Sequence, residues 1–151
     1  MNQKLEKFLA KKQKQSSKAS TINWDERRDN YLAAVESLYR RIESMLGEAI
    51  QKKSVTVQRH PKHLTENYIG TYQADDLTLV IGDEQVRFSP RGRNIVGATG
   101  RVDILGERGE TILIHQADSS WAFVRSRQPK LETVPFDEST LAEVLQLVMR
   151  D

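Results

Sequence analysis

Asp103 and His115 are the two residues of this sequence that could form a catalytic pair. Alternation of apolar and polar residues predicts that His115 lies on a strand and that Asp103 lies on the strand before it. In a suitable register the carboxylate could orient the imidazole for general-base catalysis. An ordinary cross-strand polar pair explains the same spacing, and no serine nucleophile stands out near it. We therefore expect no catalytic site.

The other two histidines, His60 and His63, form a His-x-x-His pair with Pro61 between them. A metal site needs three or four ligands, and no carboxylate follows before Glu66. The chain has no cysteine, which excludes thiolate metal sites, thiol catalysis and disulfides. It also lacks the Gly-x-x-x-x-Gly-Lys-Ser/Thr phosphate loop and the Gly-x-Ser-x-Gly nucleophile motif. We expect neither a metal nor a cofactor.

Positive charge is concentrated at the N-terminus, although the net charge of the 151 residues is only +2. Residues 1–20 contain six lysines and one acid, Glu6, whereas the rest of the chain carries 17 basic and 20 acidic side chains. Such a segment favours association with an anionic partner, either an acidic protein or nucleic acid. A solubilising terminus and a membrane-surface contact are alternatives. The lysines are Lys4, Lys7, Lys11, Lys12, Lys14 and Lys18.

A second group of basic residues surrounds the loop at 90–94, which has the sequence Pro-Arg-Gly-Arg-Asn. Arginine forms bidentate contacts with phosphates and carboxylates. A later loop carries Arg125, Arg127 and Lys130. If the strands bring the two loops to one end of the sheet, their arginines form a rim that could contact a phosphate backbone. The predicted partner-binding residues of this group are Arg87, Arg91, Arg93 and Arg101.

The N-terminal segment is expected to be a basic, flexible tail over residues 1–22. Leu5, Phe8 and Leu9 recur at helical spacing within it, which predicts a short amphipathic segment. The following residues, Gln15 to Ser20, have the composition of a flexible linker. The segment lacks the long apolar run of a secretory signal and the arginines of a transit peptide.

Apolar residues at helical spacing predict a long helix over 24–52, with Asn23 or Thr21 as its N-cap. The apolar stripe is three heptad positions wide. This width favours packing within the chain over the narrow seam of a coiled coil. Because about 27 residues at 1.5 Å each reach roughly 40 Å, a homodimer through this helix is a further expectation.

After residue 53 the pattern changes to a period of two, which predicts six or seven short strands over 54–134. The clearest hairpin runs from Leu77 to Phe88, and Gly97 and Gly100 indicate a bulge or bend in a later strand. A final helix over 138–150 follows, with Thr140 and Glu143 as a capping box. The sequence thus predicts one α+β domain over 23–151, with an antiparallel meander that forms a strongly bent sheet or a small barrel.

These features favour a small, cytoplasmic, non-catalytic binding or adaptor protein whose lysine-rich terminus contacts an anionic macromolecule. The alternative is a nucleic-acid-binding protein that uses both this terminus and the arginine loops. A small barrel that binds or hydrolyses a ligand is a third possibility, and it depends on Asp103 and His115. No stretch of about 18 apolar residues is present, so we expect no transmembrane segment.

Overall fold

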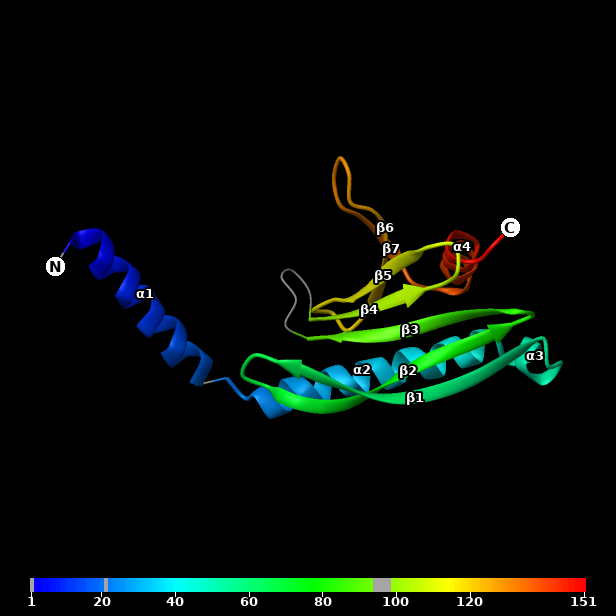
Figure 1. The fold of residues 1–151 in the computed structure, drawn as a ribbon, viewed down its shortest axis with the longest axis horizontal. Coiled ribbons are helices and arrows are strands. Elements are labelled where there is room, and N and C mark those ends of the chain that lie inside the picture. The colour runs from blue at the N-terminus through cyan, green and yellow to red at the C-terminus, as the bar shows by residue number, and fades with distance from the viewer. Residues whose placement is uncertain (1, 21, 94–98) are drawn as a thin grey trace.

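The centre of the protein is one antiparallel sheet of seven strands, in which each strand pairs with the next along the chain. The computed structural model describes residues 2–20, 22–93 and 99–151. Figure 1 shows a long helix lying along the first three strands and a C-terminal helix beside the later ones. The elements are, in order, α1 (Gln3–Ser20), α2 (Trp24–Met45), α3 (Gly47–Gln51), β1 (Val55–Glu66), β2 (Gly70–Ile81), β3 (Glu84–Gly92), β4 (Gly100–Leu105), β5 (Glu110–His115), β6 (Trp121–Ser126), β7 (Glu132–Pro135) and α4 (Glu138–Val148).

This architecture confirms the predicted α+β fold, with a meander of strands between helices. The sheet is open, so the small barrel that the sequence also allowed is wrong. Within the described parts of the chain, β1 pairs with β2 alone and β7 with β6 alone. Side chains of α2 fill the inner face of the sheet, which therefore curves around a helix instead of closing on itself.

Contacts of α2 with strands far apart in the sheet show this curvature. The Tyr39 hydroxyl donates a hydrogen bond to the Asp75 carbonyl of β2 at 2.6 Å and lies 3.3 Å from the Phe88 carbonyl of β3. From β6, the Trp121 indole Nε1 donates to the Ala34 carbonyl of α2 at 3.2 Å. The sheet thus wraps α2 from β2 to β6 and brings the later strands close to the helix.

One hydrophobic core lies between the helices and the inner face of the sheet. Five side chains of α2 are buried in it, which confirms that this helix packs within the chain: Tyr31, Val35, Leu38, Tyr39 and Ile42. Burying a large apolar side chain contributes about 1.5–3 kcal/mol, so this face of α2 is a major source of stability. From α4, the core receives Leu141, Val144 and Val148. A homodimer through α2 stays a prediction.

The helix ends differ in detail from those predicted. The long helix stops at Met45, and Gly47 begins the separate short helix α3, because glycine is unfavourable inside a helix. Asn23 caps α2 by accepting a hydrogen bond from the Glu26 amide at 3.0 Å, while Thr21 lies outside the described residues. At α4 the capping box joins Asp137 and Thr140. The predicted box of Thr140 and Glu143 is wrong, because Glu143 binds Arg125 instead.

The N-terminal segment is helical over most of its length. α1 continues to Ser20, so the expected linker over residues 15–20 belongs to this helix. Figure 1 shows α1 projecting away from the sheet. None of the helices in the described chain combines the length and the apolar character that a membrane span requires.

The irregularity of the middle strands also differs from the prediction. Gly97 lies outside the described residues, and at Gly100 the pairing of β4 with β5 is continuous. The shift in register occurs in β3, between Pro90 and Gly92. Gly100 has another role, because a Cβ there would lie 2.5 Å from the Tyr31 ring. This glycine therefore lets α2 approach β4.

Candidate anion-binding cleft

The structure separates Asp103 and His115, the two residues that the sequence allowed as a catalytic pair. Asp103 lies opposite Ile112 on β5, whereas His115 lies opposite Gly100 on β4. Ile112 and His115 are three residues apart on one strand, and alternate residues point to opposite faces, so Asp103 and His115 face away from each other. The two side chains therefore do not make the contact that a catalytic pair would need.

Asp103 instead joins two of the predicted partner-binding arginines on the outer face of the sheet. Its carboxylate accepts hydrogen bonds from Arg101 Nε at 2.6 Å and from Arg91 Nε at 2.9 Å. Arg87 lies on the same face, 3.8 Å from the Asp76 carboxylate. Three of the four predicted arginines thus lie next to carboxylates, and only Arg93 extends toward a different surface.

His60 and His63 both lie on β1. Because His60 and His63 are three residues apart on a strand, they also point to opposite faces. Across the described residues, no group of three or more His, Cys, Asp or Glu side chains could hold a metal ion.

The lysines of α1 are exposed and regularly arranged. Lys4, Lys7, Lys11 and Lys14 are spaced three and four residues apart, so they share one side of the helix, which we call the lysine face. Lys12 lies on another side, with its ammonium 5.8 Å from the centre of the Phe8 ring. Like charges at these spacings repel, and a bound polyanion would relieve this repulsion.

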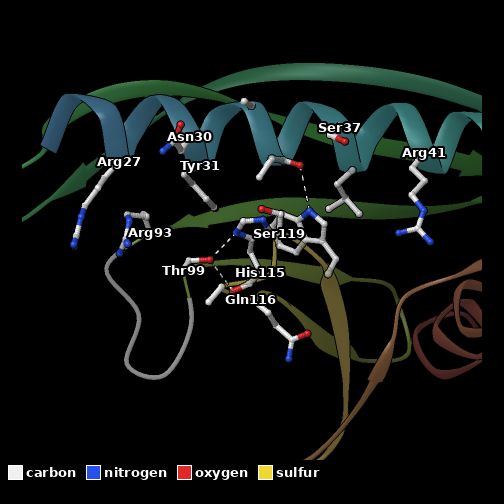
Figure 2. Close-up of a pocket in the computed structure, with 15 residues that line it drawn as sticks. Arg27, Asn30, Tyr31, Ser37, Arg41, Arg93, Thr99, His115, Gln116 and Ser119 are labelled. Atoms are coloured by element: carbon white, nitrogen blue, oxygen red, sulfur yellow. Dashed lines mark hydrogen bonds between the residues drawn. The ribbon is translucent and has the colours of Figure 1, made fainter. Parts of the chain in front are cut away.

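A cleft of about 580 Å³ lies between α2 and the ends of β4, β5 and β6. It contains three arginines and no acidic side chain among its described lining residues, and we call it the arginine cleft. Figure 2 shows Arg27 and Arg93 at one end of it and Arg41 at the other, with His115 and Ser119 between them. The remaining polar residues of the lining are Asn30, Ser37, Thr99 and Gln116.

The geometry of α2 sets the length of this cleft. Arg27 and Arg41 lie four turns apart on one side of the helix, which separates their backbones by about 21 Å at 1.5 Å per residue. In contrast to most arginines of the protein, the guanidinium groups of Arg27, Arg41 and Arg93 make no ion pair with any described acidic residue. The nearby Glu66 carboxylate accepts instead from the Arg93 backbone amide, at 2.7 Å.

The electrostatic environment of the cleft favours an anion. Burial lowers the pKa of Arg93, and the positive charge of Arg27 lowers it further, while Glu66 opposes these effects. Two guanidinium groups that repel each other in a partly buried place are stabilised when an anion binds between them. The unpaired arginines therefore predict an anionic ligand at the Arg27–Arg93 end.

His115 lies in the middle of the cleft and is held by neighbouring groups. Its Nδ1 lies 2.6 Å from the Thr99 hydroxyl, and its ring lies 5.0 Å from that of Trp121. Burial lowers the pKa of His115, and the positive charge of Arg93 acts in the same direction, against the opposing effects of the Ser119 backbone and Asp118. The imidazole is therefore a neutral part of the cleft wall at neutral pH.

This lowered pKa of His115 makes stability depend on pH. The unfolded chain binds a proton at His115 more readily than the folded chain, so the stabilisation is complete above the ordinary pKa of 6.5 and is lost as the pH falls below it. We therefore compare the free energies of unfolding of the native protein and of His115→Gln. The difference between them should shrink as the pH falls from 7.5 to about 5. Urea unfolding of both proteins across this range tests the expectation. A constant difference between the two curves would contradict it.

Sequence reasoning missed Arg27 and Arg41. The signal that could have found them is a seven-residue repeat of Arg27, Ala34 and Arg41, which follows the edge of the apolar stripe. Small residues between two arginines on one helical face leave room for a ligand. The pairing of this face with Arg93 depends on the fold, because 52 positions separate Arg93 from Arg41.

Comparisons of the chain with models of known protein families, with curated proteins and with solved structures found no match. The assignment of a function therefore depends on the arginine cleft and the lysine face themselves.

Proposed function

We propose that the protein binds nucleic acid without catalysing a reaction on it. The observation that carries this proposal is the arginine cleft, in which Arg27, Arg41 and Arg93 have no ion pair with a described acidic residue. Arginine is the side chain best suited to phosphate, because its planar guanidinium makes two parallel hydrogen bonds to the oxygens. The cleft would hold phosphates of the bound nucleic acid.

An aromatic pair beside the cleft favours nucleic acid over an acidic protein as the partner. The rings of Trp24 and Tyr68 stack with their centres 5.2 Å apart, and the Arg27 guanidinium lies 5.2 Å from the centre of the Trp24 ring. Tyr68 is 66% exposed. Exposed aromatic rings next to guanidinium groups form stacking surfaces for bases.

The lysine face of α1 supports the same function in a different way. Its ammonium groups are exposed on a helix that projects from the sheet, where they can attract a polyanion before it reaches the cleft (Figure 1). Such charges mainly raise the association rate and the salt dependence of binding. The arginines of the cleft would then position the bound nucleic acid.

Fluorescence anisotropy with short labelled RNA and DNA tests this function. The double variant Arg27→Gln/Arg41→Gln removes two cleft charges, and Arg28→Gln/Arg40→Gln removes two charges from neighbouring positions of α2 that pair with acidic residues. We expect the cleft variant to lose roughly tenfold or more in affinity at low salt, and the salt slope to fall by about 2. The matched variant should retain its affinity within about twofold.

Two results would contradict the proposal. If the native protein binds neither RNA nor DNA at low salt, the anionic partner is an acidic protein or there is none. If the cleft variant and the matched variant lose equal affinity, general charge and not the arginine cleft holds the nucleic acid. Removal of residues 1–20 separates the contribution of the lysine face from that of the arginine cleft. We expect this deletion to slow association more than it speeds dissociation.

A further inference from the structure

We infer that the arginine cleft takes a single strand of nucleic acid, extended along α2, and excludes a duplex. This inference rests on the proposed function and specifies its ligand. The strand would place one phosphate at the Arg27–Arg93 end and another at Arg41, about 21 Å away along the helix.

The size of the cleft is the first argument. Its volume of about 580 Å³ is in the range of sites for single small molecules, of roughly 300–1,000 Å³. A duplex carries its phosphates on the outside of a wide cylinder, and it could touch the rim but not the floor of such a cleft. An unpaired strand can turn a base or a sugar inward while its phosphates stay at the arginines.

The chemistry between the arginines is the second argument. Between the two charged ends the lining is neutral and able to form hydrogen bonds, as expected for contact with bases or sugars. Asn30 and Ser37 lie on α2, and Gln116 lies across the cleft from this helix, after the end of β5 (Figure 2). A site built for several adjacent phosphates would carry cations at this place as well.

The aromatic pair is the third argument, because it lies at the Arg27 end. Trp24 stacks on Tyr68, and the exposed Tyr68 ring could receive the base that follows the first phosphate. Stacking of this kind needs an unpaired base and tolerates any sequence. We therefore expect the cleft to prefer single strands without strong base specificity.

A variant that fills the cleft without changing its charge tests the inference. Ser37 is an exposed residue that lines the cleft, and Ser44 is an exposed residue of the same helix outside it. We expect Ser37→Phe to weaken binding of a labelled RNA of about eight nucleotides by roughly tenfold, and to leave binding of a duplex of the same length unchanged. Ser44→Phe should change neither affinity. Thermal unfolding of both variants checks that the fold is retained.

The outcomes separate this inference from the proposed function. Equal affinity of the native protein for single strand and duplex, with both weakened by Arg27→Gln/Arg41→Gln, would overturn the single-strand inference and leave the function standing. A loss of duplex binding in Ser37→Phe equal to that of single strand would overturn it as well. Competition by adenosine monophosphate at the same concentration as the eight-nucleotide RNA would assign the cleft to a free nucleotide instead. If no nucleic acid binds, both proposals fail.

Discussion

Gly106→Ala should lower the free energy of unfolding by about 3 kcal/mol or more. The substitution removes no existing contact, and we expect no other substitution of this kind to have so large an effect. A Cβ at this position would lie 2.2 Å from the carbonyl oxygen of Val148, at the end of α4. This oxygen is backbone, and it already accepts a hydrogen bond from the Arg108 amide at 2.9 Å. The variant must therefore move α4, whose Val148 side chain is fully buried in the core.

Gly47→Ala is the matched control for this substitution. A Cβ there would meet no atom within 4 Å, and the residue lies in the short helix α3. Alanine should be neutral or stabilise by up to about 1 kcal/mol, because it reduces the freedom of the unfolded chain and favours a helix. Denaturant unfolding of the two variants measures both effects. A Gly106→Ala protein as stable as the native one would show that α4 does not lie against the β4–β5 turn.

Asp103→Ala is the second substitution with a large expected effect. The Asp103 side chain is 8% exposed, and its carboxylate accepts hydrogen bonds from Arg91 and Arg101. Its removal leaves two neighbouring guanidinium groups without their shared anion. Loss of one partner from a buried ion pair costs about 3–5 kcal/mol, and the partial exposure of both arginines reduces the expected loss of unfolding free energy to about 2–3 kcal/mol.

Glu132→Ala provides the comparison for Asp103→Ala. Glu132 also pairs with an arginine, Arg125 at 3.5 Å, but both side chains are exposed. Exposed pairs contribute about 0–1 kcal/mol, so this variant should lie within about 0.5 kcal/mol of the native protein. If Asp103→Ala is equally mild in urea unfolding, the outer-face cluster does not contribute to stability. Combining Asp103→Ala with Arg91→Ala and Arg101→Ala should recover part of the loss.

Local patterns in the sequence predicted the elements of the fold well, because local interactions largely determine them. The period of two over 54–134 predicted the strands, and the structure has seven of them over 55–135. The hairpin from Leu77 to Phe88 has the predicted pairing, with Gly82 at a positive φ of 63° in its turn. Errors occurred at helix ends. There a single residue can cap or break the helix, and several neighbouring side chains can cap the same backbone amide.

The charges were harder to predict, because their partners are distant in the sequence. The arginines around the loop at 90–94 looked like one basic group. Strand pairing places Asp103 beside Arg91 and Arg101, whereas Arg93 turns toward α2. The arginine cleft therefore consists of two residues that the sequence analysis did not select and one that it did.

The sequence by itself determined the order of helices and strands, the apolar face of α2 and the lysine-rich N-terminus, since each of these depends on residues within a few positions of one another. Only the tertiary structure decided which charges are paired, because this depends on register and on the curvature of the sheet around α2. A shift of one residue between β4 and β5 would reverse which residues share a face. The same curvature brings Arg93 and His115 beside Arg27 and Arg41, and thereby makes a cleft that no single segment of the chain contains.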